Sequence, residues 1–505
     1  MRFSLSTSIF IMVGFSVLGQ NNPNEGRNLT FEEALDLTLR NNHLIKQYSN
    51  KSLQMEQEMK AARGLHLPRI SVSASYVYMS DNIELDLTPV RDAISPLYSA
   101  LGHYGKFGGV ANPDPKTNGV MPFFPDDIST TVIRGKMLQG LETVNNGQWV
   151  QTIQEKKFGM VNAGFVFPLY TGGKINAANK AAKINYEASE IETIQKSSEL
   201  IGELVERYFG WILARQAAKV RQEVKTGMEK HYLDAQKLSQ QGMIARVEVL
   251  NAKVYFADAD REQKKSDRQV EIVQEAVLNT VAEDVSQPLN PVSELFFTET
   301  IESLGYFKQK ALENSPLLGQ VNKKKELAEQ GIKVEQSGYW PTIAATGTFD
   351  LVNKDLSPYL PDYMVGVGLQ WNLFDGLARN RKVKAAKIQQ MQAEDFYLKA
   401  ESDIYSAINK YYQELHMYVE QINELDAAME FTAEYSRARE KAFLEGMATA
   451  TQVSDANLAV AKVKIERLQA MYAWDVTLSK LLYYSGLSGT FVNYMTRQDT
   501  KTGSY

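Results

Sequence analysis

The spacing of apolar residues changes at two prolines, Pro68 and Pro341. Before each proline the apolar positions follow a helical period, and after it they alternate with polar residues for about ten positions. The alternating apolar residues are Ile70, Val72, Ala74, Tyr76 and Tyr78 after the first proline, and Ile343, Ala345, Phe349 and Leu351 after the second. Proline ends a helix, and strict alternation places successive side chains on opposite faces of a strand. The pattern therefore predicts that a helix passes into a two-faced β-strand at both places.

Two further segments, 161–169 and 365–373, alternate in the same way and predict partner strands. One face of these strands is apolar and aromatic, and the other carries Ser, Thr, Gly, Gln and Asn. About ten residues is the length of a tilted strand that crosses a lipid bilayer. Four strands cannot close a barrel, and an open sheet edge within hydrocarbon leaves backbone groups unsatisfied. We therefore expect three copies to form one twelve-stranded barrel with a polar lumen; a soluble β-sandwich is the alternative that alternation leaves open.

Long helices connect the predicted strands. From Gly172 to Gly242, and again from Gly376 to Gly446, the chain runs about 70 residues without a proline, which as a helix spans about 105 Å. At each far end a glycine breaks the pattern and a second helix of about 40 residues returns, so we expect two long helical hairpins. The second hairpin has the alternate spacings of four and three that are typical of coiled coils, at Ile404, Ile408, Tyr411, Leu415, Tyr418, Ile422, Leu425 and Met429.

The chain also repeats itself. Residues 39–70 align without a gap with 312–343 at a shift of 273, and 164–183 align with 368–387 at a shift of 204. Because the shifts differ by 69, the first copy carries that many extra residues, within a long loop at 81–157. The predicted organisation is a signal peptide at 1–19, a first repeat at 20–286, a linker at 287–300, a second repeat at 301–490 and a C-terminal tail at 491–505, disordered from Thr496. The expected fold class is mainly α with a small membrane β part, internally duplicated.

Composition narrows the possible functions. The 505-residue chain has a formal net charge of −5 with the two signs well mixed, so it lacks the basic field that nucleic-acid binders use to neutralise phosphates. Arg2 followed by the apolar run 9–18 is typical of a secretory signal peptide, and the lack of cysteine excludes disulfides and thiolate metal sites. Beyond that signal, no run reaches the roughly 20 consecutive apolar residues of a membrane helix. Any membrane contact is therefore expected from strands.

No arrangement of residues in the sequence points to catalysis. The five histidines are His43, His66, His103, His231 and His416. None has a second histidine or a carboxylate at a convincing metal-ligand spacing, which favours ordinary surface or interface roles. The run Thr171-Gly172-Gly173-Lys174 lacks the first glycine of a phosphate loop and the Ser or Thr that follows the lysine. We expect no metal, no cofactor and no enzymatic activity.

The helical tips carry the most specific pattern in the chain. Gly242 precedes the run Val249-Leu250-Asn251-Ala252, and Gly446 precedes Val453-Ser454-Asp455-Ala456. Together with the duplicated strand and hairpin unit, these runs resemble the TolC-type outer-membrane efflux family over nearly the whole chain after the signal. The resemblance implies a homotrimeric duct, with a barrel in the outer membrane and an α-helical barrel across the periplasm.

In that family, acidic residues near the second tip ring the closed periplasmic entrance and are held by tyrosine and arginine contacts. Asp455 matches one such acid, whereas Gln452 stands where another acid is expected. Phe443 replaces the tyrosine and Ala448 replaces the arginine. The latch of the family is therefore not reproduced residue by residue.

The first copy offers other polar groups for a gate. Glu248 and Asn251 occupy the corresponding positions and Arg246 lies nearby in the sequence. The resemblance thus implies a periplasmic gate built from Asp455, Gln452, Glu248, Asn251 and Arg246. Solvated charges at a helix end are the alternative.

The resemblance also implies partners. Gly242, Met243, Gly446 and Met447 match the tips that dock a periplasmic adaptor, or membrane fusion protein. The expected function is the outer-membrane channel of a tripartite efflux or type I secretion system, driven by an inner-membrane pump of RND or ABC type, in contact with outer-membrane lipid and without nucleic acid. A trimeric surface adhesin with a helical stalk is the rival from another class, but it predicts a single copy of the unit.

Overall fold

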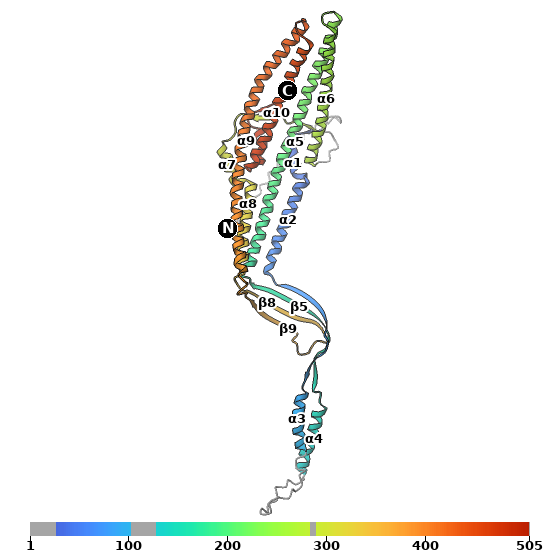
Figure 1. The fold of residues 1–505 in the computed structure, drawn as a ribbon, viewed down its shortest axis with the longest axis vertical. Helices are drawn as coiled ribbons and strands as arrows, with labels where there is room; N and C mark the ends of the chain where they lie inside the picture. Colours follow the sequence, from blue (N-terminus) through green and yellow to red (C-terminus); the bar gives the residue numbers. More distant parts are fainter. Residues whose placement is uncertain (1–26, 103–127, 283–288, 504–505) are drawn as a thin grey trace, which may run out of the picture. The chain divides into compact units, whose positions relative to one another are not determined.

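A computed structural model of the chain describes residues 27–102, 128–282 and 289–503 (Figure 1). The signal peptide predicted at 1–19 lies outside these residues. The chain divides into two compact units, of which one comprises 1–62, 176–335 and 377–505 and the other 63–175 and 336–376. The first unit is predominantly helical, and the second holds the main β-sheet.

Two long hairpins dominate the helical unit. The first pairs α5 (Lys174–Gln240) with α6 (Arg246–Val281), and the second pairs α9 (Ala378–Leu444) with α10 (Ala450–Tyr484). Helices α5 and α9 each contain 67 residues, close to the predicted length. The prediction of two long helical hairpins is confirmed. None of the helices described here combines the length and the apolar character needed to cross a bilayer.

Four shorter helices precede the strands. These are α1 (Phe31–Asn41), α2 (His43–Arg63), α7 (Leu304–Asn314) and α8 (Pro316–Ser337), and a 3-10 turn at Gly64–His66 follows α2. The junctions between these helices contact the returning helices of the hairpins. Between α1 and α2, the Asn42 side-chain amide donates to the Thr280 carbonyl near the end of α6 (2.9 Å). Gly486, just after α10, has φ +71°, and a Cβ there would lie 2.5 Å from the backbone of Asn314. Only glycine fits this junction.

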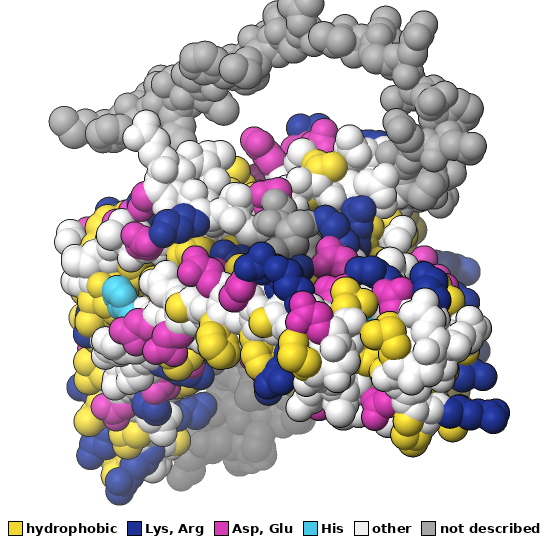
Figure 2. Space-filling view, turned by 90° about the horizontal axis from the view of Figure 1, so that it is seen from above, with side chains coloured by type: hydrophobic (Ala, Val, Ile, Leu, Met, Phe, Trp, Pro, Cys, Tyr) yellow, Lys and Arg dark blue, Asp and Glu magenta, His cyan; other side chains and the backbone are white. Residues whose placement is uncertain are grey.

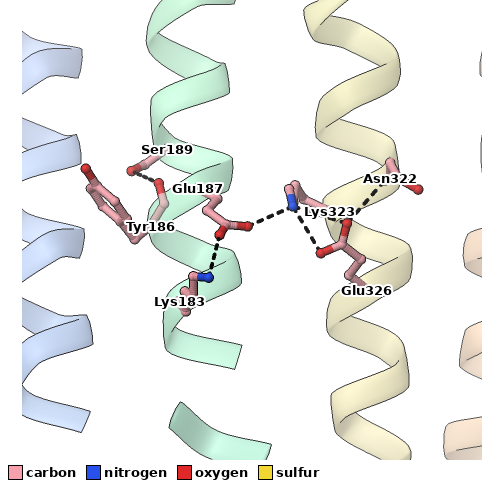
Figure 3. A network of polar contacts seen from close by, with 7 residues as sticks. All are labelled: Lys183, Tyr186, Glu187, Ser189, Asn322, Lys323 and Glu326. Carbon is pink, nitrogen blue, oxygen red and sulfur yellow. Dashed lines mark hydrogen bonds and ion pairs between the residues drawn. The ribbon is translucent and has the colours of Figure 1, made fainter. Parts of the chain in front are cut away.

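An ion-pair network joins α5 to α8 (Figure 3). Lys323 of α8 bridges Glu187 of α5 at 2.8 Å and Glu326 of its own helix at 3.0 Å, and Lys183 lies 3.4 Å from Glu187. The hydrogen bond from Lys323 holds the pKa of the Glu187 carboxyl below its usual range. Because the groups form a network with a half-buried lysine, they orient α8 along α5 more firmly than an isolated surface pair would.

An aromatic core fills the helical unit. The ring of Phe31 lies 5.2 Å from that of Phe209 and 5.3 Å from that of Phe491, and Phe296 lies 5.4 Å from Trp474. All five rings are buried, from elements far apart in sequence. The neighbouring Tyr208 hydroxyl donates to the Leu29 carbonyl at 2.6 Å, so its one polar atom is satisfied.

The expectation of a disordered tail from Thr496 is wrong for the described residues. Strand β10 (Thr500–Thr502) pairs antiparallel with β7 (Phe296–Thr298), after the short helix α11 (Phe491–Met495) and a 3-10 turn at Ser488–Thr490. The segment is ordered because Phe491 and Tyr494 are buried in the aromatic core. The expected linker is structured as well from β6 (Leu289–Pro291), which pairs in parallel with β1 (Arg27–Leu29).

The second unit is built on a four-stranded antiparallel sheet in the order β2-β5-β8-β9. Its strands are β2 (Arg69–Tyr78), β5 (Lys157–Tyr170), β8 (Thr342–Lys354) and β9 (Tyr363–Gln370). The four predicted strands are confirmed, and β2 and β9 are the edge strands of the sheet. Gly347 faces Phe165 across the β5–β8 pair, where an added Cβ would lie 2.2 Å from the ring, so the phenyl group covers the glycine.

The segment 81–157 differs from the simple loop that we expected. Its described part forms an antiparallel ribbon of β3 (Ile83–Asp86) and β4 (Val150–Gln154), and between these strands in the chain lie two packed helices, α3 (Thr88–Gly102) and α4 (Ile128–Asn146). Apolar residues in this segment recur at helical spacing, which the expectation of a loop did not take into account.

Candidate functional site

Both hairpins turn through a glycine at the predicted tip. Gly242 has φ +76° and Gly446 has φ +72°, values that side-chain-bearing residues rarely adopt. The Met243 N–H donates back to the Leu238 carbonyl at 2.9 Å, and the Met447 N–H donates to the Ala442 carbonyl at 2.8 Å. These bonds close the carboxyl ends of α5 and α9 in Schellman fashion. Met243 and Met447 are left 55% and 71% exposed, as apolar side chains at the ends of the hairpins.

A small apolar cluster joins the hairpins just behind these turns. We call it the tip cluster; it consists of Ala235 and Ala252 from the first hairpin and Phe443, Ala450 and Val453 from the second. It is separate from the aromatic core. Three of its five residues are alanine, which lets the helices approach closely while burying little area. The tip cluster, with Tyr232, Leu238, Ile244, Val249 and Ala448 packed against it, is therefore a small contact that is distinct from the main core.

Glu248 connects the two hairpins through a helix cap. Its carboxylate Oε2 accepts a hydrogen bond from the backbone N–H of Ala450, the first residue of α10, at 2.9 Å. The first N–H groups of a helix lack intrahelical partners, and the helix dipole favours a negative charge beside them. Glu248 of one hairpin thus satisfies a free donor on the other. We call this contact the cross-hairpin cap.

Gln452 also serves the start of α10, within its own hairpin. The Thr449 hydroxyl accepts from the Gln452 N–H at 3.3 Å, and the Gln452 side chain accepts from the Thr449 N–H at 3.1 Å. This reciprocal pair is a capping box, in which glutamine acts as well as glutamate. Gln452, which stands where the family has an acidic residue, therefore has a local structural role.

His231 lies buried beside the cross-hairpin cap. Its Nε2 atom lies 3.2 Å from the Ala450 carbonyl oxygen, so the neutral ring donates from Nε2, and its edge meets Phe443 with centroids 4.5 Å apart. Burial lowers the pKa of the His231 imidazole; the bond to Ala450 and the charges of Asp234, Glu440 and Glu248 act in the opposite direction. Both backbone polar groups of Ala450 are thus held by the first hairpin.

Two further polar contacts cross between the hairpins near the tip. Lys230 of α5 forms an ion pair with Glu440 of α9 at 2.7 Å, and the Tyr255 hydroxyl of α6 lies 3.4 Å from Asp455 of α10. The second contact is long and exposed, which makes it weaker than the cross-hairpin cap. Acidic and basic side chains are interspersed on the face seen from above the view of Figure 1, without a large area of one sign (Figure 2).

The structure brings together some of the predicted gate residues. Glu248, Gln452 and Asp455 all lie at the junction of α6 with α10. Arg246 is exposed and Asn251 half-buried, and neither bonds to the described part of the second hairpin. His231 was expected to have a surface or interface role, and it lies at the interface between the two hairpins. Its spacing could have indicated this.

The signal is the row of buried residues along α5. Val220, Val224, Met228, His231 and Ala235 recur at spacings of four and three, which places His231 on the packed face of the helix. Among the residues that the structure describes, no group of three or more His, Asp or Glu side chains is placed to hold a metal ion.

Comparison with solved structures supports the fold. CmeC, an outer-membrane channel of Campylobacter jejuni, superposes with a TM-score of 0.66 at 14% identity, covering 91% of this chain and 86% of that one. The MtrE outer-membrane channel of Neisseria gonorrhoeae, in its open state, gives 0.66 at 14%, covering 91% and 89%. VceC of Vibrio cholerae gives 0.65 at 12%, covering 90% and 96%. No curated protein matches this chain in sequence.

Long paired hairpins with a separate antiparallel sheet thus place the chain in the fold class of outer-membrane channels. The family model described as "Outer membrane efflux protein" matches residues 145–282 and 308–487. The chain belongs to the outer membrane efflux protein family. It is an efflux channel of the outer membrane rather than an enzyme.

Proposed function

We propose that three copies of this chain form a duct, in which twelve strands close a barrel in the outer membrane and the helical hairpins form an α-helical barrel through the periplasm. The open four-stranded sheet carries this proposal. Its edges, β2 and β9, present unpaired backbone groups, which are too costly to expose to hydrocarbon. Because the sheet has an even number of antiparallel strands, β9 of one copy can pair antiparallel with β2 of the next. Every pair of neighbouring strands in the closed ring is then antiparallel.

We further propose that the chain consists of two repeats, 20–286 and 301–490. The equal length of α5 and α9 supports this, since an α-helical barrel with its tips at one level needs arms of one length. The segment 81–157 then accounts for the difference between the halves, on the outer side of the barrel.

The cross-hairpin cap supports a gate at the periplasmic tip. Glu248, Asp455 and His231 hold the second hairpin against the first, and Gln452 caps the helix start that Glu248 contacts. Releasing these contacts would let the hairpins part around the small tip cluster and widen the entrance. Arg246 and Asn251 line the same end of α6 and would meet solvent or a neighbouring copy. By conformational selection, a partner would open the duct by binding more tightly to the state in which the hairpins have separated.

The tips themselves are proposed to dock a periplasmic adaptor, which couples the duct to an inner-membrane pump of RND or ABC type. Exposed Met243 and Met447, next to Gly242 and Gly446, offer adaptable apolar contacts of the kind that bind helical partners. The adhesin alternative is disfavoured because the family to which the chain belongs consists of efflux channels.

Planar-bilayer recording on the purified protein, with its mass measured in detergent, tests the duct. A trimeric mass and discrete conductance steps are expected. A stable monomer, or a trimer that never conducts even after the gate variants described below, would refute the proposal.

A further inference from the structure

The outer helix pair, α3 and α4, has little core of its own. Within the described parts of the helix pair and ribbon, Gly102 and Gln154 are the buried residues. Helices of 15 and 19 residues are marginal in water unless a tertiary partner covers one face, and a two-stranded ribbon is marginal too. The pair therefore lacks the packing that would stabilise it in isolation.

The two helices meet through one face of α3. A Cβ added at Gly140 would lie 2.7 Å from the ring of Tyr98, and one at Gly102 would lie 2.8 Å from Leu138, so close contact requires these glycines. The Ser95 hydroxyl also bonds to Asn145 at 2.8 Å. Ser95, Tyr98 and Gly102 thus define the face of α3 that α4 covers.

A different face of α3, together with Leu87 just before the helix, carries a coiled-coil seam. Leu87, Val90, Ile94, Leu97 and Leu101 follow one another at spacings of three, four, three and four. Val90, Leu97 and Leu101 are 45%, 59% and 39% exposed, and Ile94 is half-buried. We call these five residues the α3 seam. The described residues of the same chain cover this apolar row only in part, and Leu97 is its most exposed member.

The ribbon of β3 and β4, from which α3 and α4 extend, is anchored at its base. The Gln154 side chain donates to the Asp355 carbonyl (2.8 Å) and accepts from the Ser357 N–H (2.7 Å), and Gln151 bonds to the Tyr359 hydroxyl (2.9 Å). These bonds tie the ribbon to the connection between β8 and β9. In the chain, the ribbon follows β2 and leads into β5, so it extends from the end of this strand pair. In the proposed trimer, three such ribbons would rise from the same rim of the barrel.

We propose that the α3 seams of three copies pack against one another as a parallel three-helix coiled coil at the outer end of the barrel. This inference rests on the proposed trimer. A second copy fits better than another partner because symmetry supplies an identical seam at the same height and in register. Joined through the barrel, the three helices have a high effective concentration, so a short seam is sufficient.

The charges of the helix pair also favour a second copy of the chain, rather than a lipid surface, as the partner that covers the α3 seam. The helix pair has Arg91, Asp92, Arg134, Lys136 and Glu142 as its charged residues. Arg91 and Asp92 pair with each other at 2.7 Å, and the remainder leave no basic face of the kind that binds anionic lipid.

Site-specific cross-linking tests the seam, and the lack of cysteine in the chain makes each introduced thiol unique. Leu97→Cys and Leu101→Cys place a thiol in the seam. Asp92→Cys is the matched control, exposed on the same helix two positions from the seam residues Val90 and Ile94. Each variant is purified in full length, its trimeric mass is verified, and it is oxidised with copper phenanthroline or labelled with a water-soluble maleimide.

Seam thiols are expected to give a cross-linked dimer at least tenfold faster than the control, and to react with maleimide at least tenfold more slowly. A trimer whose seam thiols label as fast as Asp92→Cys would overturn the inference, because the seam would then face water. Seam thiols that are protected yet never cross-link would also overturn it, since lipid or another protein would be the cover. A protein that is not trimeric would instead remove the proposed duct, and this inference with it.

Discussion

Removing the cross-hairpin cap is the sharpest perturbation of the proposed gate. In Glu248→Ala, the Ala450 N–H loses the carboxylate that accepts its hydrogen bond at 2.9 Å, while the capping box of Thr449 and Gln452 remains. The variant leaves the tip cluster unchanged in composition. It therefore weakens the closed state without creating a cavity in it.

The size of the effect follows from the kind of contact that is lost. A helix cap contributes about 1 kcal/mol, and a hydrogen bond to a charged group about 1.5–3 kcal/mol. Glu248 is half-buried, and water can replace it once the hairpins part, so we expect a loss of about 1–2 kcal/mol. At 1.4 kcal/mol for each factor of ten, the ratio of open to closed channels rises about 5- to 30-fold.

Single-channel recording of the trimer in planar bilayers measures this ratio as an open probability. Glu248→Gln keeps an acceptor oxygen without the charge and should give a smaller increase. Thr449→Ala removes the cap that α10 makes within its own hairpin, so it reports the effect of a frayed helix end alone. Glu275→Ala, exposed near the far end of α6, controls for the loss of one carboxylate. The reasoning fails if Glu248→Ala gates like Glu275→Ala, or if Thr449→Ala opens the channel equally.

Four further expectations follow. Asp455→Ala should raise the open probability less than Glu248→Ala, because its contact with Tyr255 is long and exposed; an equal or larger rise would reverse this ranking. The lowered pKa of buried His231 means that the tip packing is fully stable above about pH 6.5 and weakens as the pH falls below it. Open probability should therefore rise from pH 7.5 to 5.5, and His231→Gln should flatten this dependence. Phe491→Ala should destabilise the helical unit by about 3–5 kcal/mol in denaturant unfolding followed by circular dichroism, whereas a disordered tail would give no change. Burial raises the pKa of Asp475 well above its usual range, so its ionisation opposes folding as the pH rises; Asp475→Asn should raise the melting temperature at pH 8, and less at pH 5.

The secondary structure of the chain could be predicted because it depends on local periodicity. Proline marks the passage from helix to strand before β2 and β8, and alternation defines the four strands. Gly242 and Gly446 mark the hairpin turns because those positions need a left-handed backbone. Each signal lies within a few residues of the feature that it predicts.

Other features escaped this reasoning because their partners are distant in sequence. Phe491 orders the C-terminal segment only because Phe31 and Phe209 form a buried place for its ring. The segment 81–157 was expected only as a long loop, because it holds the 69 extra residues of the first copy. In the structure, Gly140 instead provides the close contact between α3 and α4.

The sequence by itself determined the two long hairpins, the presence of the four strands, the position of both tips and the resemblance to outer-membrane efflux proteins. Only the tertiary structure decided that Glu248 caps the opposite hairpin and that His231 lies buried beside it. The physical reason is that periodicity defines which face of a helix is apolar, whereas the rotation and height at which two helices pack decide which single side chains meet. At the tip, these two quantities bring a carboxylate within 2.9 Å of the N–H of Ala450, some 200 residues away along the chain.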